Sequence, residues 1–117
     1  VDTAGALTPT SAGNAVFYVD STTTPSQGIF DVTGPNGATV SVILPSAPVT
    51  VTCATGIAFT LDTFVDDTGG GTVSTSGSGT PVTVNVGATL KTDSTVLATT
   101  GYDTQTCTGT YTMTISL

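Results

Sequence analysis

Hydrophobic and hydroxyl-bearing residues alternate along most of this chain, and the last eleven residues show the pattern most plainly. One parity of this segment carries its apolar side chains, which are those of Cys107, Tyr111, Met113, Ile115 and Leu117. Threonine or serine occupies every position of the other parity. Successive side chains of a β-strand point to opposite faces, so residues 110–117 are predicted to form a strand with one apolar face and one hydroxyl face.

Similar short segments follow one another along the rest of the chain. They predict strands at residues 15–19, 28–33, 38–44, 49–53, 57–62, 72–75 and 82–90. Between two of them, Gly34-Pro35-Asn36-Gly37 predicts a hairpin turn, and the prolines of Pro45-Ser46-Ala47-Pro48 end one strand before the next begins. No stretch keeps the spacing of an amphipathic helix. We therefore predict a single all-β domain over residues 1–117, an antiparallel immunoglobulin-like β-sandwich of about seven to nine strands.

The composition excludes several classes of function. The chain has 29 threonines and 10 serines, no histidine, one basic residue (Lys91) and a net charge of −7. Contacts to phosphate groups need lysine or arginine, so we expect neither nucleic-acid binding nor attachment to an anionic membrane, and no segment reads as a membrane span. A histidine-dependent nucleophile is excluded as well. We predict that the protein is not an enzyme, with no catalytic residues and no cofactor.

The acidic residues give two candidate sites, both of which we consider weak. Asp67-Thr68-Gly69 has the sequence of the aspartic-protease signature, which would need two such carboxyls sharing a proton in a homodimer. The glycines that follow predict a mobile loop, whereas that chemistry needs a rigid turn. Asp62, Asp66 and Asp67 offer oxygen ligands for Ca²⁺, but their spacing is not that of a calcium-binding loop. We expect a solvated loop and no metal site.

The two cysteines have the apolar parity of their strands. Cys53 and Cys107 would close a loop of about 55 residues if they were bonded. Two buried free thiols in a cytosolic protein are the alternative. The scarcity of lysine and the abundance of small hydroxyl residues are typical of exported proteins, and a first residue other than methionine is what we expect of a processed product. We therefore predict a Cys53–Cys107 disulfide and an extracellular location.

Several strand motifs, taken in order, resemble one known family. They are Phe30-Asp31-Val32-Thr33-Gly34, then Gly37-Ala38-Thr39-Val40-Ser41-Val42-Ile43-Leu44-Pro45, then Val84-Asn85-Val86-Gly87-Ala88-Thr89-Leu90, and Gly109-Thr110-Tyr111-Thr112-Met113-Thr114-Ile115. The chain resembles, over most of its length, a bacterial family of secreted β-sandwich domains that is catalogued only as a domain of unknown function. The resemblance implies an immunoglobulin-like surface protein akin to pilins, and it brings no catalytic residues. The cysteine pair is not part of the family pattern.

Members of that family begin with a further strand, and residues 1–5 resemble the downstream end of that region. A sandwich lacking one strand has a groove of unpaired backbone groups, which a strand from a neighbouring copy can fill. The candidate donors are an N-terminal arm at residues 1–13 and the C-terminal strand, with subunit-contact residues Val1, Leu7, Tyr111, Met113, Ile115 and Leu117. The alternative is a fold that closes on itself, with the disulfide at Cys107 keeping the C-terminal strand in its own subunit.

These expectations combine into one functional hypothesis. We predict a structural subunit of an extracellular, pilus-like or fimbria-like filament on the bacterial cell surface. Its partners would be identical copies, joined by strand complementation between subunits. A monomeric surface adhesin or a carbohydrate-binding module is the alternative.

Overall fold

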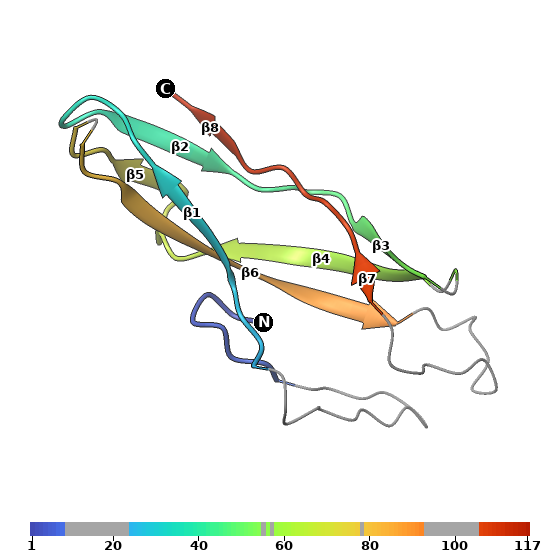
Figure 1. The fold of residues 1–117 in the computed structure, drawn as a ribbon. Coiled ribbons are helices and arrows are strands. Elements are labelled where there is room, and N and C mark those ends of the chain that lie inside the picture. Colours follow the sequence, from blue (N-terminus) through green and yellow to red (C-terminus); the bar gives the residue numbers. More distant parts are fainter. Residues whose placement is uncertain (9–23, 55, 57, 78, 93–105) are drawn as a thin grey trace.

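The computed structural model describes residues 1–8, 24–54, 56, 58–77, 79–92 and 106–117, which contain eight β-strands and no helix (Figure 1). The strands are β1 (Gly28–Val32), β2 (Thr39–Ile43), β3 (Val49–Cys53), β4 (Ala58–Asp66), β5 (Thr72–Ser74), β6 (Val82–Thr92), β7 (Cys107–Thr108) and β8 (Thr114–Ser116). The predicted all-β class is confirmed. The strand expected at residues 15–19 lies outside the described residues.

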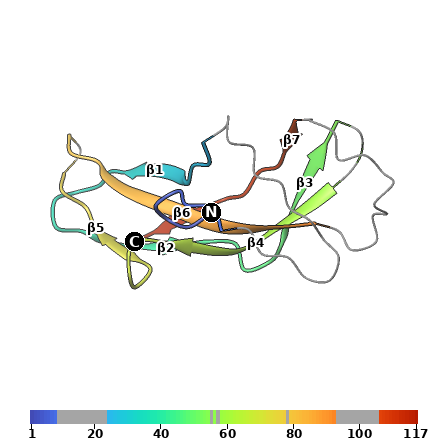
Figure 2. The ribbon, with the colours of Figure 1, turned by 90° about the horizontal axis from the view of Figure 1, so that it is seen from below.

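The strands form two antiparallel sheets. The larger sheet has the order β1-β6-β4-β3-β7, and the smaller has the order β5-β2-β8. Figure 2 shows that the larger sheet is curled, because its strands change direction steadily from β1 through β6 and β4 to β3 and β7. A bulge in β4 contributes to this curl: the β4–β6 register shifts between Asp62 and Val65, where Thr63 has a positive φ of 52°.

The turn at residues 34–37 differs from its prediction. It does not close a hairpin, because β1 pairs with β6 in the larger sheet while β2 pairs with β5 and β8 in the smaller. The reason is Thr75, whose hydroxyl donates to the Pro35 carbonyl (2.5 Å) and whose backbone N–H donates to Ala38 (2.8 Å). Gly37 in turn donates its N–H to the Thr75 carbonyl (2.8 Å). The turn is thus bonded to Thr75, which directly follows β5 of the smaller sheet. Between β1 and β2 the chain crosses from the larger sheet to the smaller.

The structure also differs from the prediction at residues 110–117, where only Thr114–Ser116 form a strand. Figure 1 shows that the C-terminal segment runs antiparallel to the segment that forms β2 and then β3. Ile43 pairs with Thr114 at one end of this ribbon, and Thr52 pairs with Thr108 at the other. Eight residues (44–51) lie between those pairs on one side and five (109–113) on the other, so the ladder is interrupted. Two of the eight are prolines, which cannot donate to a ladder.

The core consists mainly of valine side chains, and both sheets contribute to it. Its buried residues are Val32, Val40, Val42, Val84 and Val86. Around them pack the half-buried side chains of Phe30, Leu44, Phe64, Val73, Tyr111 and Met113. Both sheets and the C-terminal segment supply these side chains, so the core is what holds the two sheets together.

We expect Thr75→Val to lower the free energy of unfolding by about 1–3 kcal/mol, because it removes a buried donor from the Pro35 carbonyl. Thr72→Val, an exposed position on the same strand segment, is the matched control and should change stability by less than about 0.5 kcal/mol. Urea denaturation followed by circular dichroism measures both values. Equal stability of the two variants would contradict the role given to Thr75.

Candidate subunit-contact surface

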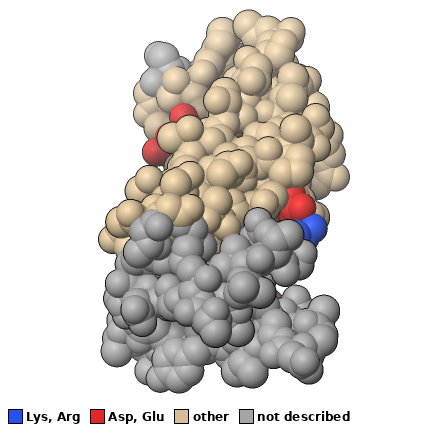
Figure 3. Space-filling view, turned by 90° about the vertical axis from the view of Figure 1, so that its right-hand side faces the viewer, with Lys and Arg blue, Asp and Glu red and all other residues tan. Residues whose placement is uncertain are grey.

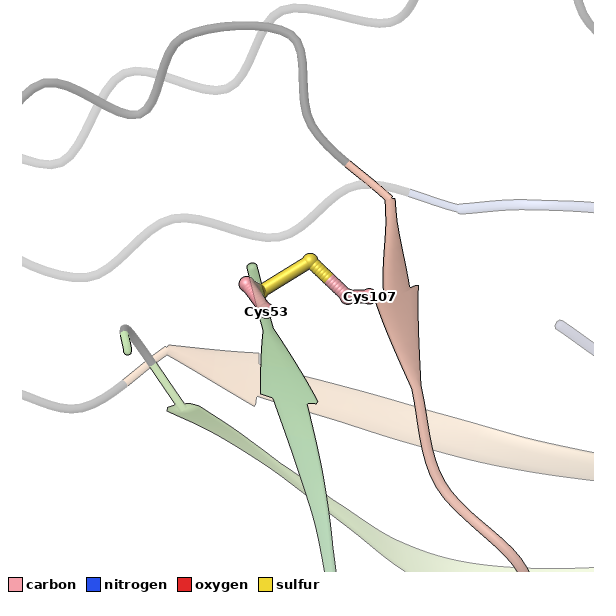
Figure 4. The surroundings of a disulfide bond; sticks show 2 residues. All are labelled: Cys53 and Cys107. Atoms are coloured by element: carbon pink, nitrogen blue, oxygen red, sulfur yellow. A yellow bond between two sulfur atoms is a disulfide. The ribbon is translucent and has the colours of Figure 1, made fainter. Parts of the chain in front are cut away.

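The C-terminal segment begins at a disulfide. Cys53 in β3 and Cys107 in β7 face each other in the ladder, and their sulfur atoms are bonded at 2.06 Å (Figure 4). Cys53 is buried and Cys107 is half-buried. The predicted disulfide is present, and it ties the base of the C-terminal segment to the edge of the larger sheet.

Two of the predicted subunit-contact residues pack inside their own chain. The Tyr111 ring lies 4.9 Å from the Phe64 ring and 6.0 Å from the Phe30 ring, measured between centroids. Its hydroxyl lies so close to Gly28 that a side chain there would collide with it. Burial raises the pKa of Tyr111 above its usual value of 10.0. Met113 packs against the valine core. Both residues therefore serve the fold of this chain.

The other two C-terminal candidates remain exposed. Ile115 is 38% exposed and Leu117 is 90% exposed. Ile115 lies opposite Val42 in the β2–β8 ladder, so it belongs to the inner, apolar face of the smaller sheet. The alternation of apolar and hydroxyl residues therefore continues beyond Met113, the last residue that packs against the described core. This leaves two large apolar side chains at the rim of the sheet.

The backbone of β8 also has a free edge among the described residues. The Val42 N–H donates toward β5, to the Gly71 carbonyl (2.7 Å). Backbone groups in an antiparallel sheet alternate sides along a strand, so Ser41 and Ile43 bond to β8 and Val42 does not. Ile115, the partner of Val42, must then direct its N–H and C=O away from β2. In the part of the chain that the structure describes, β8 is an edge strand whose outward groups have no partner strand.

A shallow cleft lies where the ribbon is interrupted. It has a volume of about 460 Å³ and is lined by residues 43–49 on one side and by Thr110, Tyr111, Thr112 and Thr114 on the other. Its walls combine apolar groups with threonine hydroxyls. The cleft follows from the unequal lengths of the two chain segments, and Tyr111, which packs into the core, is one of its lining residues.

Of the two N-terminal candidates, Val1 lies on the other sheet. The Val1 nitrogen donates to the Ala88 carbonyl (2.7 Å), and the Ala88 N–H donates to the Val1 carbonyl (2.8 Å). This exchange continues the β1 side of β6 by one residue pair. The neighbouring Gly87 permits the approach, because a Cβ there would come within 2.7 Å of the Asp2 carbonyl carbon. Leu7 is 45% exposed. Residues 9–13 of the predicted arm lie outside the described residues.

The described carboxylates have partners within the chain. Asp62 accepts from Lys91 (2.7 Å), and this hydrogen bond holds the pKa of Asp62 below its usual value. Figure 3 shows a basic group (blue) beside an acidic one (red) on one flank of the molecule. Lys91 is exposed and Asp62 is half-buried. Asp67 accepts from the side chain (2.7 Å) and the backbone N–H (3.0 Å) of Asn85, which likewise lowers its pKa. Asp66 accepts from the backbone N–H of Thr68 (2.9 Å).

These bonds assign structural roles to the two sites that the sequence suggested. The loop of Asp67-Thr68-Gly69 is fastened to β6 through Asn85, and Gly71 donates to the Thr68 hydroxyl (2.7 Å). Within the described ranges no group of three or more acidic or cysteine residues is arranged to hold a metal ion. Asp62 forms its ion pair with Lys91, and the bulge separates Asp62 from Asp66 and Asp67 along the chain.

Comparison with known proteins identifies a family. A family model described as "Domain of unknown function (DUF4402)" matches residues 1–116. The chain matches none of the curated proteins and none of the solved structures with which it was compared. In the described part of the chain no helix is long and apolar enough to cross a membrane.

Asp67→Ala should make stability less dependent on pH. A carboxyl whose pKa is lower in the folded chain contributes stability above its unfolded pKa of about 3.9, and this contribution is lost as the pH falls through the folded pKa. We expect the variant to be less stable than the parent at pH 7 and to approach it below about pH 3. Asn85→Ala removes the main donor and should show the same trend. Parallel stability curves from pH 7 down to pH 2.5, measured by urea denaturation, would contradict this role.

Gly87→Ala should displace the N-terminal residues from β6, because the new methyl group would collide with the backbone at Val1 and Asp2. We expect faster amide hydrogen exchange at Ala88, by about tenfold or more, since its N–H loses the Val1 carbonyl. Gly70→Ala is the control, because a Cβ there meets nothing within 4 Å. Unchanged exchange at Ala88 would show that the contact does not need a glycine.

Proposed function

The chain belongs to this family of domains of unknown function, and we propose that it is a structural subunit of an extracellular filament, of the pilus or fimbria kind, on the bacterial cell surface. In this proposal copies of the chain associate by strand addition. We take the two antiparallel sheets as the halves of an immunoglobulin-like sandwich, which is supported by a valine core to which both sheets contribute. Among the described residues the smaller sheet has three strands.

The observation that carries the proposal is the free edge of β8. Its outward backbone groups and the exposed side chains of Ile115 and Leu117 occur together at one rim of the smaller sheet. Unpaired strand edges with apolar side chains are the surfaces that add further strands, and natural proteins usually protect them with charges or prolines. Strands β8 and β5 carry neither a charged residue nor a proline.

The distribution of charge favours contact at the same sheet. A chain with a net charge of −7 repels its own copies wherever acidic surfaces meet. The described acidic residues lie on the larger sheet, in the loop after β4 or in the N-terminal segment; they are Asp2, Asp31, Asp62, Asp66 and Asp67. The smaller sheet has none, and its outer face carries Thr39, Ser41, Ile43, Thr72, Ser74, Thr114 and Ser116. It is the surface on which copies meet with the least repulsion.

The contacts of the C-terminal segment indicate how β8 would take part. Removing this segment for donation to another copy would expose the Tyr111 ring and Met113 and would pull against the disulfide at Cys107. We infer that β8 stays in its own subunit and offers its outer edge to a strand of a neighbour. The disulfide also favours an oxidising location outside the cytosol.

A pair of charge-matched variants tests this proposal. We expect the apparent mass of the parent chain in light scattering to rise with concentration, and fibres to be visible by electron microscopy. Leu117→Lys places a charge at the β8 edge and should reduce association at least about tenfold, without changing the fold. Leu90→Lys makes the same charge change at an exposed position (57%) of the larger sheet and should associate like the parent.

A monodisperse monomer at every concentration would refute the filament proposal. If such a monomer bound glycans on an array, the adhesin or carbohydrate-binding alternative would replace it. Equal association of the two lysine variants would show that the chain assembles through a surface other than β8.

A further inference from the structure

We propose that two copies of this chain pair β8 with β8 in antiparallel orientation, about a twofold axis through Ile115. This inference rests on the proposed function and adds the identity and the register of the strand that fills the edge. The occupant of the edge is the same strand of a second copy. The result is a six-stranded sheet with the order β5-β2-β8-β8-β2-β5.

The backbone sets the register. Val42 bonds to Gly71, so its partner Ile115 directs its N–H and C=O away from β2. The backbone groups of Met113 and Leu117, two positions away, point in the same outward direction. Around a twofold axis at Ile115, this residue faces itself and Met113 faces Leu117 of the other copy. Every residue with outward backbone groups then lies opposite another such residue. No shift of the strand and no change in the β2–β8 ladder is needed.

The side chains match in the same register. Met113, Ile115 and Leu117 have one parity, so the inner face of the joined strands would carry only apolar pairs. Thr114 would lie opposite Ser116 of the other copy on the outer face, giving hydroxyl pairs. Apolar and hydroxyl pairs between directly opposed strands are stabilising. The exposed fraction of Leu117, 90%, would fall because it would lie beside Met113 of the second copy.

A head-to-tail contact, in which β8 of one copy pairs with β5 of the next, is a less favourable way to pair the same edge. Strands β5 and β8 both run antiparallel to β2, so they run parallel to each other. If β8 met β5 of the next copy with the inner faces on the same side, the new pair would be parallel, and parallel pairing is slightly less stable per residue. β8 paired with β8 keeps every neighbouring pair antiparallel. Twofold contacts of this kind are also the commonest in homo-oligomers.

None of the described strands covers the outer edge of β8. Figure 1 shows β8 along the upper rim of the described fold, at the opposite end of the C-terminal segment from the disulfide. None of the described acidic residues lies in the smaller sheet, so the twofold contact brings no aspartate side chains together. A filament would then grow from such pairs through a second contact, and the uncharged β5 edge lies at each end of the joined sheet.

Cysteine cross-linking of the full chain tests the pairing. Ile115→Cys places two sulfur atoms across the twofold axis, within the separation that a disulfide spans. Under mild oxidation we expect covalent dimers to form at least about tenfold faster than in Ile29→Cys, because pairing raises the local concentration of the partner thiol. Ile29 is the matched control: it is an isoleucine, 63% exposed, on the edge strand β1 of the other sheet. Mass spectrometry confirms that Cys53–Cys107 is intact.

A second pair of variants tests the register and leaves the inner face unchanged. Thr114→Cys and Ser116→Cys alter exposed outer-face positions, and each should cross-link poorly with itself. Mixed together, they should give a covalent heterodimer, because residue 114 of one copy lies opposite residue 116 of the other. Cross-linking in the mixture that is no faster than in either variant alone would overturn the register.

The outcomes separate this inference from the proposed function. If the parent chain associates but Ile115→Cys dimerises no faster than Ile29→Cys, the β8 pairing is wrong and assembly through another surface stands. If Thr114→Cys mixed with Thr72→Cys gives covalent heterodimers faster than Thr114→Cys mixed with Ser116→Cys, the contact is head-to-tail and the twofold pairing is overturned. A parent chain that is monomeric at every concentration refutes both proposals.

Discussion

The two sheets of this protein depend on one ribbon, in which the C-terminal segment runs antiparallel to the segment that forms β2 and β3. One end of the ribbon belongs to the larger sheet and the other to the smaller, so the ribbon connects the two sheets. The interruption in its middle is equally important. There Pro45 and Pro48 supply no N–H, the ladder opens, and Tyr111 fills the space between Phe30 and Phe64. The disulfide then fixes one end of the ribbon and leaves the other end, β8, at a rim.

The same alternation of apolar and hydroxyl residues produces both the core and the exposed rim. In β2 the two valines that pack against valines of the larger sheet are buried, at 4% and 7% exposed for Val40 and Val42. At β8 the pattern continues, but the described chain supplies no layer beneath it, so Ile115 and Leu117 are exposed. A threonine-rich outer face does not compensate for this, because hydroxyl groups interact well with water and with each other. Charge is the usual protection of an edge, and here it is found on β1, at Asp31, and not on β8.

Much of the fold was predictable because strand formation here is a local property. Period-two alternation located most of the described strands, and the parity of Cys53 and Cys107 indicated that their side chains point to the same interior. The choice of partner strand was not predictable, because it depends on contacts far apart in the sequence. Gly34-Pro35-Asn36-Gly37 has the composition of a hairpin turn, but the Thr75 hydroxyl, 40 residues from Pro35, bonds to it and directs β2 into another sheet. No local signal marks Thr75 among 29 threonines.

The candidate contact residues show the same limit more sharply. Tyr111, Met113, Ile115 and Leu117 have one parity and look equivalent in sequence, yet the first two pack in the core and the last two do not. Parity defines a face, whereas burial depends on what lies opposite each position of that face. Pairing between two copies of one strand requires that the strand match its own reversed sequence, and the parity of its residues is enough to give this match. A strand of alternating apolar and hydroxyl residues matches its own reverse about any apolar position, so an unprotected edge of this kind is complementary to a second copy of itself. The described aspartates all lie outside the smaller sheet, so in our proposal the alternation that builds the fold also provides the edge at which copies join.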